Sequence, residues 1–281
     1  MMRQFKVLVG MFFIFVLTAC SFGGGRHSQS ASLVDFLYPD GQQPSHRADA
    51  IPQLSLPLRV GIAFVPSQHS RHNQLSEAKK NQLLTNVAKQ FETEAFIEHI
   101  EVIPDIYMRQ GKGFNTIEQL SRLYNIDVIA LVSYDQIANN HQNNLALTYW
   151  TIVGAYIIPG DNTDVQTFVD TAVFDVATRK LLFRAPGIDT TKKIHTAVSA
   201  EETYQTMSSK SFDNAMSAMS VNLKKSLEQF KEKVKENKSV AQVKYRSGYR
   251  GGGGSLEWFG LILLLALCTL RRTAQETFTK E

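Results

Sequence analysis

Side chains that could do chemistry are few and widely spaced in this 281-residue chain. His69 and His72 form an H-x-x-H pair, and two imidazoles three residues apart on a helix could share a metal ion. Their segment contains no acid and has a loop-like composition, so a solvated loop is the favoured interpretation. Asp161 and Asp164 flank a predicted turn, where a weak cation site is the alternative to a plain turn. Gly111–Gly113 lacks the spacing of a phosphate-binding loop and is interpreted as an ordinary loop.

No nucleophile and base lie at spacings typical of a catalytic site. The sequence has no Gly-x-Ser-x-Gly elbow, and its serines, histidines and aspartates are too scattered to nominate a triad. We therefore expect no catalytic residue, no metal and no cofactor, and a protein that is not an enzyme. The alternative is a hydrolase whose site is assembled only in the folded chain.

A cysteine near the N-terminus carries the clearest chemical signal. The chain begins with a basic flank, continues with an apolar segment over 7–17, and ends that segment in the letters LTAC at Cys20. Such a segment is typical of a signal peptide and is too short to span a bilayer. This order resembles bacterial lipoprotein precursors, which implies that the Cys20 thiol receives a diacylglyceryl group and that signal peptidase II cuts before it. Ser21 in the next position then implies export to the outer membrane, whereas the alternative is a buried cysteine in a first helix.

A second apolar segment lies close to the C-terminus. It covers 258–270 and is followed by Arg271 and Arg272, which would hold that end in the cytoplasm. A glycine run precedes it, and this order resembles the GlyGly-CTERM sorting signal, which implies cleavage by a rhomboid-type intramembrane protease called rhombosortase. The implied processing region is Gly251, Gly252, Gly253, Gly254 and Ser255. The alternative is a plain C-terminal membrane anchor with a glycine hinge.

The two end motifs together resemble the rhombotarget lipoprotein family. The resemblance implies a non-enzymatic lipoprotein of the cell envelope, held by its N-terminal lipid in the outer membrane or at the cell surface. The partners that it implies are the lipoprotein-processing enzymes, signal peptidase II and rhombosortase. It implies no biochemical activity for the body of the chain. A second hypothesis is therefore an adaptor for a secretion or cell-wall machine, with an unknown protein partner at the edge of its sheet.

The positive charge of the chain comes partly from these end segments. The full chain has 30 basic and 26 acidic residues, which give a net charge of +4. The predicted cleavages remove five basic and three acidic residues, which leaves +2 and does not favour nucleic-acid binding. The second cysteine, Cys268, lies in the removable C-terminal segment, so no disulfide is expected in the exported body.

Composition divides the chain into five predicted parts. The first is a lipoprotein signal peptide over 1–19, and the second is a flexible tether over 20–57, in which an apolar island is expected to dock as a helical turn. A globular domain over 58–235 and a Gly-rich linker over 236–254 follow. A transmembrane sorting tail then occupies 255–281.

Hydrophobic periodicity within the domain predicts an α+β fold. We expect a mixed sheet with a C-terminal antiparallel meander, helices packed on that sheet, and a long C-terminal amphipathic helix. The predicted strands are 58–65, 100–104, 127–134, 145–160, 163–176 and 180–187. The predicted helices are 76–99, 116–124 with Thr116 as its N-cap, and 200–235.

Overall fold

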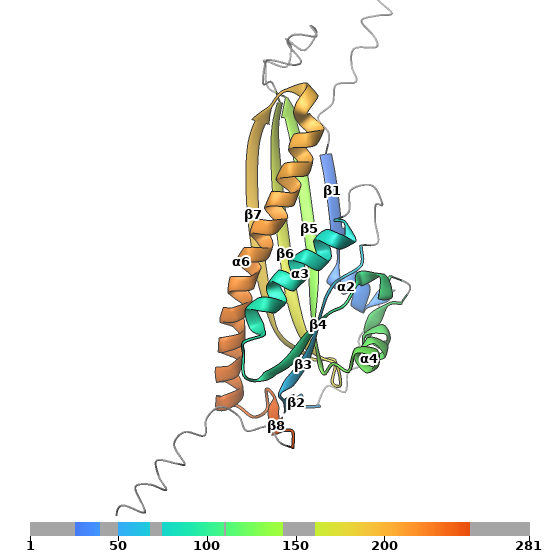
Figure 1. Ribbon diagram of the computed structural model, residues 1–281, viewed down its shortest axis with the longest axis vertical. Helices are drawn as coiled ribbons and strands as arrows, with labels where there is room; N and C mark the ends of the chain where they lie inside the picture. Colours follow the sequence, from blue (N-terminus) through green and yellow to red (C-terminus); the bar gives the residue numbers. More distant parts are fainter. Residues whose placement is uncertain (1–25, 40–49, 68–74, 110, 143–160, 248–281) are drawn as a thin grey trace, which may run out of the picture.

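Figure 1 shows an elongated fold built on one large sheet. The computed structural model describes residues 26–39, 50–67, 75–109, 111–142 and 161–247. The strands of the sheet lie in the order β4 (Ile97–Val102), β3 (Leu58–Phe64), β5 (Val128–Gln142), β6 (Asp161–Asp175) and β7 (Leu181–His195), while β1 (Arg26–Ala31) pairs with the far half of β5. Since β3 is parallel to β4 and β5 and the other pairs are antiparallel, the predicted mixed α+β sheet is confirmed.

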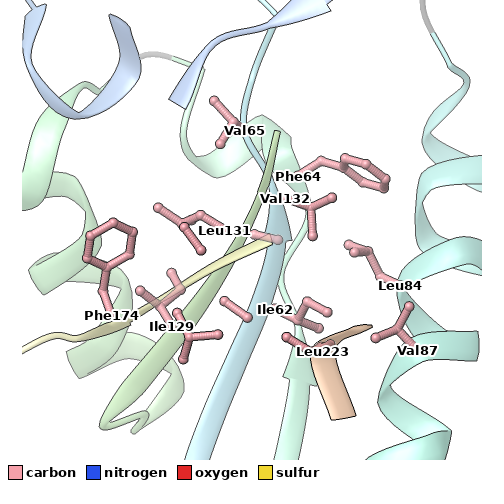
Figure 2. Packing of buried hydrophobic residues seen from close by; sticks show 14 of the residues in the cluster. Ile62, Phe64, Val65, Leu84, Val87, Ile129, Leu131, Val132, Phe174 and Leu223 are labelled. Carbon is pink, nitrogen blue, oxygen red and sulfur yellow. The ribbon is translucent and has the colours of Figure 1, made fainter. Parts of the chain in front are cut away.

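Two helices connect the parallel strands and cover opposite faces of the sheet. The helix α3 (Glu77–Phe91) follows β3, and Ser76 caps it by accepting a hydrogen bond from the backbone N–H of Lys79. The helix α4 (Gly113–Tyr124) precedes β5. Figure 2 shows Leu84 on the side of α3 and Phe174 on the opposite side of the sheet. The lower half of the fold therefore has three layers around its core.

The meander consists of three strands of fifteen residues each. The strand β5 pairs with β6 over its full length, from Val128 opposite Asp175 to Gln142 opposite Asp161. The separate strand predicted over 145–160 lies outside the described residues. In the turn between β6 and β7, the Asp175 carboxylate accepts a hydrogen bond from the backbone N–H of Thr178.

The long helix α6 (Ala200–Glu236) matches the predicted helix over 200–235 and lies against β6 and β7 (Figure 1). Its 37 residues correspond to about 55 Å, which is most of the length of the fold. The apolar residues that define its period form its buried face: Phe212, Met216, Met219, Leu223, Leu227 and Phe230. The predicted amphipathic helix is confirmed.

The predicted tether over 20–57 is wrong as a flexible segment in two places. Residues 26–31 form β1, and Gln53–Leu56 forms β2. Hydropathy does not predict β1, because this polar strand is held by backbone pairing with β5 and by the buried side chain of Gln29, which donates to Gln136. The apolar island forms the expected short helix, α2 (Leu33–Leu37).

The predicted linker over 236–254 also begins later than expected. The strand β8 (Gln242–Tyr245) pairs with β2 in parallel, which joins two segments from opposite ends of the chain. Arg246 then bonds to the Asp127 and Glu98 carboxylates at 2.5 and 2.8 Å. Backbone pairing and two ion pairs therefore include residues 242–246 in the fold.

The start of α4 corrects a further expectation. The helix begins at Gly113, which adopts φ +73°, a conformation that glycine tolerates best. Thr116, the predicted N-cap, lies inside the helix, and its hydroxyl donates to the carbonyl of Lys112 at 3.3 Å. A threonine that bonds to the carbonyl four residues earlier is compatible with a helix interior, so its presence does not mark the first turn.

Candidate functional site

The residues predicted to be modified lie outside the described part of the chain. They are Cys20 and the processing region from Gly251 to Ser255, and the H-x-x-H pair of His69 and His72 also lies outside it. The structure does place the segments that lead to the two ends. Cys20 is six residues before β1, and Gly251 is five residues after Arg246.

The two ends of the described fold lie far apart. Figure 1 shows the start of β1 near one end of the long axis and β8 near the other end. The strand β1 begins opposite Asn139 of β5, whereas β8 lies beside β2 and Arg246 reaches Asp127 at the other end of the same strand. The two chain ends are therefore directed to opposite ends of the body.

The described residues of the segment expected to hold a turn and a weak cation site, from Asp161 to Asp164, belong to the strand β6. Both positions belong to β6, and positions three apart on a strand lie on opposite faces of the sheet. The Asp164 carboxylate instead lies 3.4 Å from the ammonium group of Lys192 on β7. Among the described residues, no group of three histidines, cysteines or acids could hold a metal ion.

A buried ionic cluster, which sequence reasoning missed, lies beyond the carboxyl end of β3. Lys80 of α3 and Asp105 are each 3% exposed, and their charged groups are 2.5 Å apart. Glu77 pairs with Lys80 at 3.2 Å, and Arg109 pairs with both Asp105 and Glu77. The spacings Glu77–Lys80 and Asp105–Arg109 are those of neighbours on a helix and were the available signal. The two positive and two negative charges of the cluster add to zero. The ion pairs connect the start of α3 to the segment 105–109, which indicates a structural role.

Among the described titratable groups, Tyr134 of β5 has a strongly shifted pKa, which is a common property of catalytic residues. Burial is the main cause that raises its pKa to about 12, and the negative charge of Asp105 raises it further. Its ring packs edge-on against Phe64 and Phe212. A phenol with this pKa stays neutral at physiological pH, so Tyr134 cannot function as a base there.

A group of buried, hydrogen-bonded polar side chains around Gln136 of β5 joins α6 to the sheet. The Gln136 side chain is 1% exposed, and its amide donates to the Thr167 hydroxyl at 2.7 Å and to the Ser208 carbonyl at 3.1 Å. Its carbonyl accepts from the side chains of Gln29 and Ser208. These bonds connect β1, β5, β6 and α6, which indicates a role in fixing the position of β1 and α6.

An open groove of about 530 Å³ lies on the sheet face opposite α6. Its walls include Val34 of α2, Phe168 and Phe174 of β6, and a pair formed by Asp170 and Arg184 at 2.9 Å. This volume is within the range of ligand pockets, and the mixture of aromatic and charged walls suits a peptide segment better than a small apolar molecule.

No protein-family model and no curated protein matches the chain. Among solved structures, the chain is similar to a PelC dodecamer from Paraburkholderia phytofirmans, with 9% identity, 79% of this chain and 100% of that chain covered, and a TM-score of 0.25. The chain is also similar to protein XCC0632 from Xanthomonas campestris, with 9% identity and a TM-score of 0.31. The match covers 67% of this chain and 92% of that chain. A third similar structure is lipoprotein GNA1162 from Neisseria meningitidis, with 11% identity and a TM-score of 0.21. The match covers 57% of this chain and 96% of that chain. Likeness at this level carries no inference about function.

A membrane-spanning helix is not found within the described ranges, although α6 exceeds the necessary length. Its exposed face carries lysines and glutamates, including the pair Glu232–Lys235 at 2.8 Å. The predicted transmembrane tail over 255–281 lies outside these ranges.

Proposed function

We propose that this protein is a cell-envelope lipoprotein without catalytic activity, anchored by a diacylglyceryl group on Cys20 and trimmed near its C-terminus by a rhombosortase-type protease. The observation that carries the proposal is the order of basic flank, apolar segment and LTAC ending at Cys20. The glycine run and the apolar segment before Arg271 support the second processing step. The location that follows is the outer membrane or the cell surface.

The body of the chain is compatible with processing at both ends. The described elements extend from Arg26 to Tyr245, and both predicted cleavage regions lie outside them. Cys20 is six residues before β1, which gives a reach of about 20 Å. A lipid on Cys20 would thus keep the end of the sheet at which β1 begins close to a membrane surface.

Intact-mass analysis of the membrane-extracted full chain tests both processing steps at once. We expect a mass that begins at Cys20, includes a diacylglyceryl group and ends within 251–255. The matched control is a strain without rhombosortase, in which residues 255–281 should remain. Retention of that tail in a strain with active protease would contradict C-terminal processing, and an unmodified Cys20 would contradict the anchor.

A second candidate function is an adaptor that docks a protein segment in the open groove. Ile188 of β7, which pairs with Phe168 of the groove and lies on the same face of the sheet, is 58% exposed. Leu181, which lines the groove, is 50% exposed. Exposed apolar side chains next to a charged pair are typical of a partner surface.

Photocrosslinking in cells tests the adaptor hypothesis. A photoreactive amino acid at Phe168, in the groove, should capture one dominant protein. The same amino acid at Ser217, on the exposed side of α6, is the matched control and should capture none preferentially. A scatter of abundant proteins from both positions would count against an adaptor.

A further inference from the structure

The strand β7 forms one edge of the large sheet. Among the described strands it pairs only with β6, along its other side. An edge strand carries a row of backbone N–H and C=O groups with which a further strand can pair. Two large apolar side chains of its second half, Ile188 and Ile194, are 58% and 62% exposed. The edge of β7 is therefore a candidate surface for the addition of a strand.

The helix α6 closes only the lower part of this edge. It crosses the sheet diagonally (Figure 1). Near its start, Ser208 bonds to Gln136 of β5, two strands away from the edge. Further along, Asn222 donates to the carbonyl of Pro186 of β7 at 2.7 Å. Because Pro186 also has no backbone N–H, a further strand cannot pair there, whereas 187–195 extend beyond this contact.

The contact between Asn222 and Pro186 shows which backbone groups of β7 point outward. In a strand, the N–H and C=O groups of one residue point to one side, and those of the next residue point to the other. Since the Pro186 carbonyl points away from β6, the groups of every second residue after it do so as well. These residues are Ile188, Thr190, Lys192 and Ile194. The side chains between them face α6, because Asp189 accepts a hydrogen bond from Asn214 at 3.1 Å.

We propose that 187–195 pair antiparallel with the same segment of a second copy of this chain, about a two-fold axis at Thr191. Such an interface uses the same surface on both copies, so it closes after two. Opposite side chains must lie on the same face of the joined sheet, so the axis has to pass through a residue rather than between two residues. Thr191 is the middle residue of the open segment, and this axis leaves Pro186 outside the pairing.

This register places complementary side chains opposite one another. On the face away from α6, Ile188 would lie opposite Ile194 of the second copy, so that the exposed isoleucines cover each other. On the face of α6, Asp189 would lie opposite Lys193 of the second copy. Two-fold symmetry gives each pair twice. Apolar pairs and pairs of opposite charge directly across two strands stabilise a sheet.

The neighbouring registers lose these matches. An axis at Lys192 would place the two copies of this lysine opposite each other, which is destabilising. An axis at Thr190 would place Ile188 opposite Lys192 and would bring Pro186 into the paired segment. Lysines on an edge strand usually discourage pairing, but with the axis at Thr191 neither lysine of one copy lies opposite a lysine of the other.

The arrangement allows one membrane to hold both copies. The first residue of β1, Arg26, lies in a row that crosses the sheet through Asn139 and Asp164 to Lys192. Measured along the strands, β1 of each copy therefore begins one position from the axis, so the two Cys20 residues would be at a similar level. The proposal itself goes beyond the proposed function and does not depend on processing at either chain end.

Disulfide crosslinking of the full chain in membranes tests the register. At the axis, the two copies of Thr191 would have Cα atoms about 4.5 Å apart, which suits a disulfide. In a Cys268→Ser background, which also gives the background from Cys20, we expect Thr191→Cys to form dimers on mild oxidation. Thr190→Cys is the matched control, because its two Cα atoms would be roughly 8–9 Å apart. Equal crosslinking of both variants, or none in Thr191→Cys, would overturn the proposal.

A charge on the paired face tests the contacts across the interface. Ile188→Lys replaces an apolar side chain of the edge, whereas Val221→Lys makes a similar exchange on α6 at a position that is 68% exposed. In analytical ultracentrifugation of the detergent-extracted full chain, we expect Ile188→Lys to raise the dissociation constant of the dimer about tenfold. Val221→Lys should leave it unchanged, and circular dichroism should show that both variants are folded.

Two outcomes of this measurement would overturn the proposal. One is a wild-type chain that sediments as a monomer at every concentration. The other is a dimer that Ile188→Lys and Val221→Lys weaken equally, because the interface would then lie elsewhere on the molecule.

Discussion

At the scale of single residues, Asp127 joins three segments of the chain. It accepts hydrogen bonds from Arg59 of β3 at 2.7 and 3.0 Å and from Arg246 at 2.5 Å. Burial by itself raises the pKa of Asp127, but the hydrogen bonds and positive charges of Arg59 and Arg246 outweigh it, so this pKa lies below its usual range. The carboxylate therefore stabilises the fold in its charged form.

The pKa of Asp127 predicts a pH-dependent effect of Asp127→Asn. A lowered pKa means that the contribution is complete above the unfolded pKa of about 4 and is lost as pH falls through the folded value. Urea unfolding at pH 7 should show a loss of about 1–2 kcal/mol, because the side chain is partly exposed. At pH 3 the difference from the wild type should shrink. An equal difference at both pH values would contradict this account.

Gln136 provides a second prediction at the residue scale. Gln136→Leu leaves the amide of Gln29 and the hydroxyl of Ser208 without their buried partner, so we expect a loss of about 2–3 kcal/mol. The double variant Gln29→Leu/Gln136→Leu removes two polar groups together and should recover part of that loss. Chemical denaturation of both variants gives the comparison. Strict additivity of the two losses would contradict a shared network.

At the scale of elements, the contact between α6 and β7 depends on Gly187. A Cβ atom at this position would lie 2.1 Å from the carbonyl oxygen of Ala215 and 2.5 Å from the backbone nitrogen of Met219. Since both obstacles are backbone atoms, the helix itself would have to move. The side chain of Asn222 then completes the contact by donating to the carbonyl of Pro186 at 2.7 Å.

Gly187→Ala should therefore be strongly destabilising. We expect a loss of about 3 kcal/mol in the free energy of unfolding, measured by thermal or chemical denaturation. Thr190→Ala, three residues further along β7 and exposed, is the matched control and should change stability little. Gly187→Ala with wild-type stability would show that α6 is not packed this closely on β7.

At the scale of the whole molecule, the separation of the two chain ends limits its orientation. The lipid on Cys20 would hold the β1 end within about 20 Å of a membrane, and the twelve residues from Arg246 to the apolar segment at Trp258 would give a reach of about 40 Å at the β8 end. The fold between them is about as long as α6, roughly 55 Å. If the proposed processing holds, the untrimmed chain would have both ends of the fold near the membrane, whereas the trimmed form would be held only at the β1 end.

Fluorescence quenching by labelled lipids tests this orientation. A fluorophore at exposed Ser239, near the β8 end, should be quenched in the untrimmed form and lose that quenching after cleavage. A fluorophore at half-buried Ser67 serves as the control away from that end, and its signal should change less. Equal quenching at Ser239 before and after cleavage would contradict the change in orientation.

Local sequence determined the elements with strong periodicity. The strand β3, the start of β5 and the helix α6 follow from the spacing of their apolar residues, and the signals at the two chain ends follow from the order of basic, apolar and small residues. Such patterns depend on neighbours in the chain, so they can be recognised without a fold.

Tertiary structure alone decided the rest. The polar strand β1 is fixed by Gln29 and Gln136, which are 107 positions apart, and β8 pairs with a strand from the other end of the chain. The Lys80–Asp105 pair and the open groove likewise combine segments that no short window contains. The physical reason is that hydropathy reports which face of an element is buried, whereas pairing partners, close approaches and empty space depend on how distant elements meet.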